Sequence, residues 1–256
     1  MSTTEATDEA LLSLRGISKR FGPVQALTDV TFDIPAGQVT ALIGDNGAGK
    51  SSLIKTIAGL WSPDAGQMLW EGKPVRHSGP REAEEMGIKT IYQDLALCDN
   101  LDIVQNMFLG HEPVRLRQLD EDSMETAARQ TLKDLSVTTV RSIRQPVASL
   151  SGGQRQSVAV AKALVNAAKL VIMDEPTAAL GVAQTRMVLD LIKSLSGRGV
   201  AVLVISHNLN DIFEVADRIA VLYLGHLAVN GPASDFNRQN AVEYMTTGRA
   251  SAGAAA

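Results

Sequence analysis

The chain has 256 residues, of which 45% are hydrophobic, 20% charged and only 4% aromatic, and its formal net charge is −4. This length fits one large domain or two small lobes, and the acidic balance disfavours a protein that coats nucleic acid. The single cysteine, Cys98, cannot form an internal disulfide, which is typical of a reducing compartment.

The first residues of the sequence are not expected to act as an export signal. The first ten residues are polar and acidic and lack the basic and apolar regions of a signal peptide. No apolar run approaches the ~20 residues that a membrane-spanning helix needs. We therefore expect a soluble intracellular protein that acts on any membrane process through a partner.

The first clear elements are strands. Residues 30–34 alternate apolar and polar side chains, as a half-buried antiparallel strand does, and residues 35–37 supply a turn. Residues 39–43 are almost wholly apolar, which is typical of a central strand covered on both faces. Further buried strands are expected over residues 170–173, 200–205 and 219–224.

Helical patterns lie between these strands. Residues 187–195 place their apolar side chains on one stripe, and Gly197 marks the expected end of that helix. Strands that alternate with helices predict an α/β fold, with a mostly parallel sheet covered by helices on both faces. The antiparallel part would lie at the N-terminal side.

The middle of the chain differs, because residues from about Leu95 to Ala168 show little strand signal. Helices are expected over residues 125–135 and 154–168, so we expect a helical lobe inserted into the α/β part. The last residues, 250–256, are small-residue low complexity and are expected to be disordered.

A glycine-rich loop follows the strand at residues 39–43 and precedes a helical pattern that begins at Leu53. It fits G-x-x-x-x-G-K-[ST], the phosphate-binding loop, in the strand–loop–helix context that this motif requires. Its residues are Gly44, Asp45, Asn46, Gly47, Ala48, Gly49, Lys50 and Ser51, with Ser52 after them. The alternative is a glycine-rich turn with a chance lysine, which the flanking elements disfavour.

This loop predicts the chemistry of its side chains. Backbone N–H groups of such a loop surround phosphate oxygens at a helix N-terminus. Lys50 would reach the β- and γ-phosphates, and the Ser51 hydroxyl would bind Mg²⁺.

Two carboxylates, Asp174 and Glu175, end the strand over residues 170–173. Asp174 is placed to hold Mg²⁺, and Glu175 could orient or deprotonate the attacking water. An isolated acidic pair at a strand end is more often a solvated pair; the phosphate loop favours the functional interpretation. His207 follows the strand over residues 200–205 and would lie at the same sheet edge, as a candidate contact to the γ-phosphate.

A second glycine motif, Leu150-Ser151-Gly152-Gly153-Gln154, opens the long central helix. Ser151 and Gln154 have capping-box spacing, so a good helix start is one explanation. Glycine is nevertheless a poor helix former, whereas a bare helix N-terminus lets a phosphate approach. With these motifs in order, residues from about Leu12 to Gly231 resemble the nucleotide-binding domain of ABC transporters.

The resemblance assigns roles to individual residues. Gly44 to Ser51 looks like Walker A, Asp174 and Glu175 look like the Walker B aspartate and the catalytic glutamate, and His207 looks like the switch histidine. Leu150 to Gln154 matches the family signature. Gln93 resembles the glutamine that touches Mg²⁺ and water. Phe21 occupies the position of the aromatic residue that stacks on adenine, although a half-buried strand-end aromatic is the alternative.

One position departs from the family pattern. After Pro176-Thr177 the family usually carries S-A-L-D, whereas this chain has A-A-L-G and ends on Gly181. The change puts in doubt the details of coupling across the dimer, not hydrolysis. This segment and residues 96–101 resemble ATPases of monosaccharide importers, many of which carry two such domains; this chain has a single set of motifs.

The resemblance further implies partners and boundaries. Residues 10–233 would form a single nucleotide-binding domain with the lobe at about 94–168, followed by a helical segment over 234–249. Two copies would pair head to tail around ATP and Mg²⁺, and the surface around 95–109 would dock a membrane permease, with a solute-binding protein acting indirectly. The protein would then lie on the cytoplasmic face of the inner membrane.

The expected function is therefore an ATPase that powers uptake of a sugar. Three alternatives remain: an importer or exporter ATPase for another solute, a soluble ABC ATPase of DNA repair or translation, and an ordinary P-loop kinase or GTPase. The soluble ABC ATPases usually need coiled-coil, tandem or basic extensions, for which the sequence shows no pattern. A kinase or GTPase leaves Ser151 to Gln154 and His207 unexplained.

Overall fold

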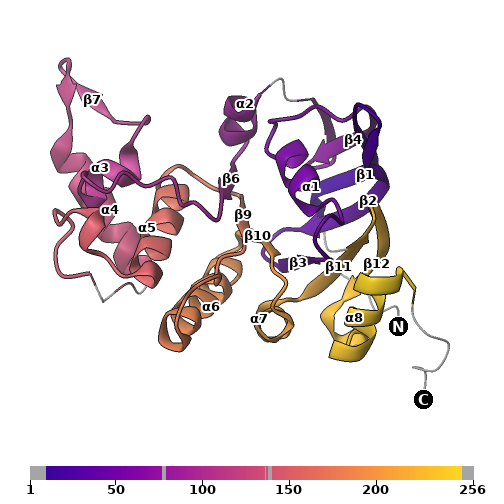
Figure 1. The fold of residues 1–256 in the computed structure, drawn as a ribbon. Helices are drawn as coiled ribbons and strands as arrows, with labels where there is room; N and C mark the ends of the chain where they lie inside the picture. The colour runs from indigo at the N-terminus through magenta and orange to yellow at the C-terminus, as the bar shows by residue number, and fades with distance from the viewer. Residues whose placement is uncertain (1–9, 77–78, 136, 138–139, 250–256) are drawn as a thin grey trace, which may run out of the picture.

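The computed structural model describes residues 10–76, 79–135, 137 and 140–249. A six-stranded sheet has the order β12-β11-β3-β10-β9-β6, and a four-stranded sheet has the order β2-β1-β4-β5 (Figure 1). The strands are β1 Ala10–Phe21, β2 Val24–Pro35, β3 Val39–Ile43, β4 Ala65–Trp70, β5 Lys73–Val75, β6 Ile88–Ile91, β7 Val114–Arg115, β8 Gln118–Leu119, β9 Leu170–Asp174, β10 Ala201–Ile205, β11 Arg218–Tyr223 and β12 His226–Pro232. The helices are α1 Lys50–Ile57, α2 Pro80–Glu85, α3 Ile103–Phe108, α4 Glu121–Asp134, α5 Gly152–Val165, α6 Val182–Ser196, α7 Leu209–Val215 and α8 Arg238–Thr247.

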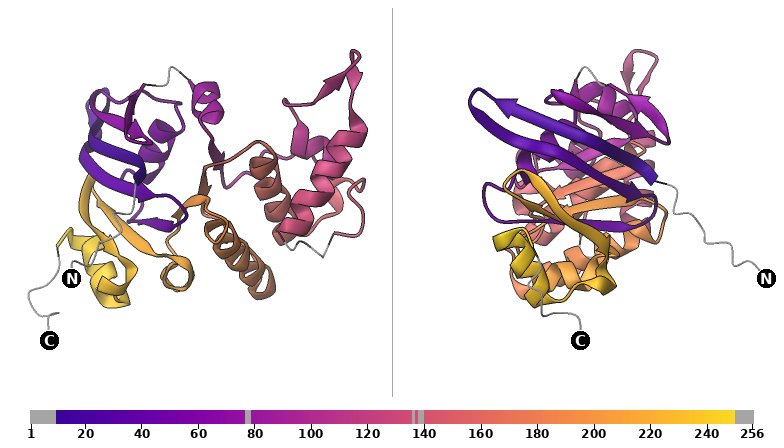
Figure 2. Two further views of the ribbon diagram at one scale, coloured as in Figure 1. Left: turned by 180° about the vertical axis from the view of Figure 1, so that it is seen from behind. Right: turned by 90° about the vertical axis from the view of Figure 1, so that its right-hand side faces the viewer.

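The larger sheet is mostly parallel, as the apolar runs predict. Strands β11, β3, β10, β9 and β6 pair in parallel, and only β12 runs antiparallel at the edge. Every residue of β3 and of β10 is buried, because helices or the second sheet cover both of their faces. The four-stranded sheet is antiparallel and lies across one side of the molecule (Figure 2).

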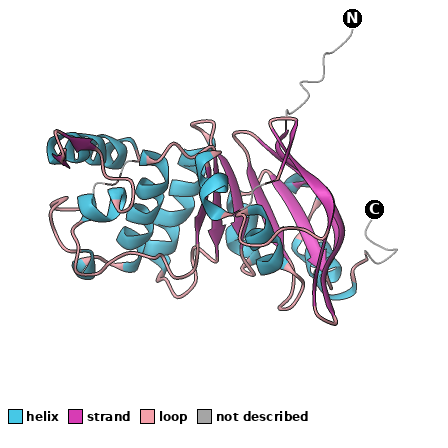
Figure 3. Ribbon diagram, turned by 90° about the horizontal axis from the view of Figure 1, so that it is seen from above, coloured by secondary structure: helices cyan, strands magenta, loops and turns pink. Residues whose placement is uncertain are grey.

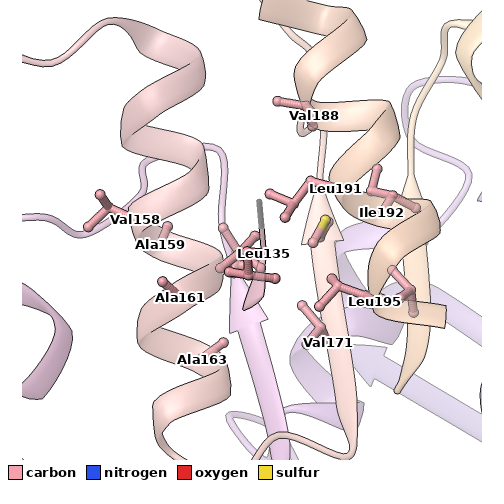
Figure 4. Packing of buried hydrophobic residues seen from close by; sticks show 14 of the residues in the cluster. Leu135, Val158, Ala159, Ala161, Ala163, Val171, Val188, Leu191, Ile192 and Leu195 are labelled. Atoms are coloured by element: carbon pink, nitrogen blue, oxygen red, sulfur yellow. The ribbon is translucent and has the colours of Figure 1, made fainter. Parts of the chain in front are cut away.

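The two faces of the six-stranded sheet have different coverings. Leu42, Ile172 and Leu203 face a core shared with α1 and the antiparallel sheet. Their neighbours in sequence, such as Val171, face a second core shared with α5 and α6 (Figure 4). The alternation follows from the two-residue period of a strand, and the expected α/β fold with helices on both faces is confirmed.

Helices α3, α4 and α5 lie together on the side of the six-stranded sheet away from the antiparallel sheet (Figure 3). Their buried residues belong to the same core as that face of the sheet, so the hydrophobic core continues into the helical part. The buried Asn106 of α3 strengthens this part by bonding the backbone N–H and carbonyl of Cys98 at 2.7 and 3.0 Å.

Some expected boundaries were wrong by a few residues. The long central helix covers 152–165 rather than 154–168, because Ser151 caps it earlier and Ala167 has a positive φ of 55°. Helix α6 starts at Val182, before the stripe that begins at residue 187, and it ends as expected, with Gly197 as its C-cap. The middle region also contains one short hairpin, β7–β8.

Two further expectations concern the end of the chain and the absence of membrane-spanning helices. The predicted disordered tail, 250–256, lies outside the described residues. Within the described part of the chain, no helix combines the length and apolar character that crossing a membrane requires.

Candidate functional site

Four parallel strands deliver the predicted site residues to one edge of the six-stranded sheet. The glycine-rich loop follows β3, Gln93 follows β6, Asp174 and Glu175 end and follow β9, and His207 follows β10. Because β3, β10, β9 and β6 are consecutive neighbours in the sheet, the loops after them meet at its carboxyl edge.

These loops surround a cavity of ≈ 670 Å³. Its lining unites most of the predicted residues, namely Phe21, Asn46, Gly47, Ala48, Gly49, Lys50, Ser51, Ser52, Gln93, Asp174 and Glu175. Gly44 and Asp45 lie outside this lining, at the base of the loop. His207 also lies outside it, and it reaches the site by contact with Glu175.

The glycines of the loop are required by its geometry. A Cβ at Gly44 would lie 2.4 Å from the Leu222 carbonyl oxygen, and one at Gly49 would lie 2.7 Å from the Ala26 carbonyl oxygen. Gly49 also has a φ of 104° and caps α1 without a side chain. The N-terminus of α1 therefore stays open toward the cavity, where backbone N–H groups and the helix dipole favour an anion.

Lys50 supplies the positive charge beside this helix end. Its Nζ donates to the carbonyl oxygens of Gly44 at 2.7 Å and Asp45 at 3.0 Å. Burial lowers the pKa of Lys50, although the nearby carboxylates of Glu175 and Asp174 oppose the shift. An anionic ligand beside this amine would favour its charged form and so raise its pKa again.

The two carboxylates have different environments. Burial, and then the negative charge of Glu175, raise the pKa of Asp174, while Lys50 opposes the rise. Glu175 Oε1 lies 2.8 Å from His207 Nδ1, and the Glu175 N–H donates to the Ile205 carbonyl at 2.8 Å. Glu175 is mostly buried at 19% side-chain exposure, whereas His207 is 71% exposed and presents its outer ring edge to solvent.

The raised pKa of Asp174 predicts that this functional carboxylate lowers the stability of the folded protein. Above its pKa in the folded protein, the half-buried charge beside Glu175 costs free energy of folding. Because solvent screens this half-exposed group, we expect Asp174→Asn to raise the melting temperature without nucleotide at pH 8 by only about 1–2 °C, for a relief of about 0.5 kcal/mol. The gain should shrink as the pH falls through the raised pKa of Asp174, where the wild-type carboxyl binds its proton, and a melting temperature unchanged by the substitution at high and at low pH would contradict the assignment.

The second glycine motif begins α5 at some distance from the cavity lining. Ser151 and Gln154 form both bonds of a capping box, with the Ser151 N–H donating to Gln154 Oε1 at 2.9 Å. A Cβ at Gly152 would lie 2.7 Å from Leu180 Cδ2, and one at Gly153 would lie 3.2 Å from Gln184 Cβ. The glycines therefore also allow close packing of α5 against the start of α6, a reason that the sequence did not reveal.

Phe21 lies at the end of β1 and is 37% exposed at the rim of the cavity. The Trp61 ring contacts it edge-on with a centroid distance of 4.5 Å. This arrangement leaves part of the Phe21 ring open to a flat ligand.

The comparisons with known proteins agree with this geometry. A family model described as ABC transporter matches residues 27–178. The chain belongs to the ABC transporter family. It is 49% identical over 93% of its length to the fructose import ATP-binding protein FrcA of Rhizobium meliloti, and 45% identical over 93% to the xylose/arabinose import ATP-binding protein XylG of Sulfolobus acidocaldarius; it covers 94% of each relative. It also spans 46% of a ribose import ATP-binding protein of Rubrobacter xylanophilus, at 42% identity.

Solved structures give the same fold. An ATP-binding cassette of an ABC transporter aligns with 92% of this chain and 96% of its own, with a TM-score of 0.81 and 26% identity. A nucleotide-free cassette aligns with 87% and 91%, with a TM-score of 0.76 and 26% identity. As an ABC family member, the chain is an ATP-binding ATPase that powers transport.

The donor set of the ABC site also fits Mg²⁺. No group of three or more His, Cys, Asp or Glu side chains placed to hold a metal occurs among the residues described. Mg²⁺ bound with nucleotide phosphates needs only one or two carboxylates and oxygen donors. Ser51, Gln93 and Asp174 supply such oxygens around one cavity.

Sequence reasoning missed some residues of the ABC site. Val24, Gln25 and Ala26 of β2 line the cavity, as do Leu224 and Gly225 in the β11–β12 turn. The Gly225 N–H donates to the Ala48 carbonyl at 2.9 Å and so supports the phosphate loop from a turn far away in sequence. The sequence signal for these lining residues was Gly225 in the turn, and many turns contain a glycine without lining a site.

Gly181 replaces the aspartate that the ABC pattern usually carries. It is the N-cap of α6, and its carbonyl accepts the N–H groups of Gln184 and Thr185, both at 2.9 Å. Apart from the two adjacent residues, no atom in the described part of the chain lies within 4 Å of a Cβ built at this position. Packing within the chain therefore does not require glycine here.

Proposed function

We propose that this ATPase powers uptake of a monosaccharide through a separate membrane permease. The observation that carries the proposal is the match over nearly the whole chain to relatives named for import of fructose and of xylose or arabinose. These named sugars are all small polyhydroxy compounds. The particular sugar would be selected by the permease and by a solute-binding protein, because the cavity in this chain has the features of a nucleotide site.

Within that function, two copies of the chain pair head to tail. The cavity holds the phosphate loop and both carboxylates, whereas Ser151 to Gln154 do not line it. A second copy would supply its own α5 N-terminus and the Ser151 hydroxyl to the γ-phosphate. ATP then joins the two copies by its charge, and hydrolysis removes the differential stabilisation of the closed pair.

The residues of each copy have separate roles in ATP hydrolysis. Lys50 exchanges its carbonyl partners for the β- and γ-phosphates. Ser51, Gln93 and Asp174 would hold Mg²⁺, which would neutralise charge on the phosphate oxygens. Glu175 orients the attacking water and receives its proton. His207 holds the Glu175 carboxylate through Nδ1 and offers its other ring nitrogen to the γ-phosphate.

The permease would dock near the segment 95–109, on the cytoplasmic face of the inner membrane. Of its apolar side chains, Ile103, Val104, Met107 and Phe108 are core residues. Leu95 and Leu109 instead line a cavity of ≈ 340 Å³ together with Tyr92, His111 and Lys162. A helix from the permease would pack in this groove, whose lining includes residues on both sides of Gln93 in the sequence.

Reconstitution tests the sugar assignment. The chain would be placed in liposomes with its native permease and solute-binding protein, and ATP turnover would be measured with pentoses, hexoses and, as controls, amino acids. We expect one or a few monosaccharides to stimulate turnover. Stimulation by an amino acid alone would contradict sugar import while leaving the transport ATPase intact.

A further inference from the structure

A second side-chain contact joins the same two loops that carry Glu175 and His207. The Thr177 hydroxyl donates to Asp211 Oδ2 at 2.7 Å. Thr177 follows Glu175 by two residues, and Asp211 lies in the first turn of α7, four residues after His207. Asp211 is only 8% exposed, so its carboxylate is held inside the protein by this contact.

The backbone at Glu175 needs such support. Glu175 has a φ of 52°, a left-handed conformation that is uncommon for a residue with a side chain. Its N–H donates to the Ile205 carbonyl, and its own carbonyl accepts the Ala178 N–H at 3.1 Å. These bonds fix the Glu175 backbone from both sides, and the hydroxyl of Thr177 adds a side-chain bond from the same turn to α7.

The loop that carries His207 is also held by hydrogen bonds of its own. The Asn208 N–H donates to the Ser206 hydroxyl at 3.0 Å, and the Asn210 N–H donates to Asn208 Oδ1 at 3.1 Å. His207 therefore lies in a turn held on both sides, and that turn leads directly into the helix that carries Asp211. The Thr177–Asp211 bond is a side-chain link between the turn of Glu175 and the helix that follows this turn.

We propose that Thr177 and Asp211 are positioning residues that keep Glu175 and His207 within hydrogen-bonding distance during ATP hydrolysis. Neither residue lines the nucleotide cavity, so both act through other residues. A hydroxyl bonded to a buried carboxylate is a short and directional contact, suited to holding two loops in register. This inference rests on the proposed roles of Glu175 and His207.

Removal of the Thr177 hydroxyl is the central test. We expect Thr177→Val to lower kcat by at least about tenfold, because a small misplacement of catalytic groups is costly, while KM for ATP changes less than about twofold. Thr177→Ser keeps the hydroxyl and should recover most of kcat. Thr246→Val is the matched control, since it removes an exposed helix hydroxyl that bonds the Val242 carbonyl at 2.9 Å far from the site.

A double-mutant comparison separates positioning from general stability. In a His207→Ala background, single-turnover hydrolysis should lose less than about threefold on adding Thr177→Val, because no pair remains to be positioned. A full tenfold further loss would overturn the proposal, as would a Thr177→Val enzyme with wild-type kcat. If Thr177→Val does not fold, Asp211→Asn replaces it; a lower kcat at unchanged KM supports the proposal and an unchanged kcat overturns it.

The same variants distinguish a failure of the positioning roles from a failure of the proposed hydrolysis mechanism. If Glu175→Gln and His207→Ala lose turnover but Thr177→Val does not, only the positioning roles fail. If Glu175→Gln itself keeps normal turnover, the proposed mechanism fails before the positioning pair is tested.

Discussion

Glu175→Gln should lower ATP turnover by about 10²–10⁴-fold, the range that loss of a general base gives, while ATP binding persists. Glutamine keeps the size of the side chain but cannot accept the proton of the attacking water. Lys50, Ser51 and the loop backbone are untouched, so the nucleotide still binds. Because ATP is then not consumed, the paired form should accumulate.

Size-exclusion chromatography with and without ATP measures this accumulation, and phosphate release measures turnover. Glu85→Gln is a matched control, because Glu85 is an exposed residue on α2. We expect it to behave as wild type in both assays. A Glu175→Gln protein that stays monomeric with ATP and turns over normally would contradict both the catalytic role and the paired mechanism.

Lys50→Ala should weaken ATP binding by about 10–150-fold, which corresponds to the 1.5–3 kcal/mol of a hydrogen bond to a charged group. The Lys50 amine lies among loop carbonyls at the open N-terminus of α1, and among the described residues that line the cavity there is no second lysine. Its removal leaves the phosphates with backbone donors and Mg²⁺ alone.

Titration with a fluorescent ATP analogue gives the dissociation constant. Lys133→Ala, on the exposed surface of α4, is the control for loss of one positive charge and should bind as wild type. Because alanine is a good helix former, both variants should remain folded. Wild-type affinity in Lys50→Ala would refute the assignment of the phosphate loop.

Much of the architecture could be predicted from short patterns. The apolar runs at residues 39–43, 170–173 and 200–205 indicated buried parallel strands. The first matches β3, the second lies in β9, and the third covers β10 together with the residue before it. These predictions succeeded because a strand buried on both faces has a local signature, independent of its neighbours. The family also followed from motifs whose residues are close together in sequence.

Less of the functional site than of the fold could be predicted from the sequence. Strand order brings Gln93, Asp174 and the phosphate loop around one cavity. The apolar strands before Asp174 and before the loop indicated this for those residues, whereas Gln93 was predicted only from the family resemblance. The sequence did not indicate that Leu180 fills the space beside Gly152, or that Trp61 contacts Phe21. Such contacts join residues tens of positions apart, and no local pattern records them.

The sequence alone thus determined the acidic and low-aromatic composition, the strand–loop–helix motif and the chemical groups that surround a nucleotide. Tertiary structure decided which of those groups touch: Glu175 with His207, and Thr177 with Asp211. The reason is physical. Local conformation depends on neighbouring residues, whereas these distances depend on how β9 and β10 pair and how α7 packs, which the whole core sets together.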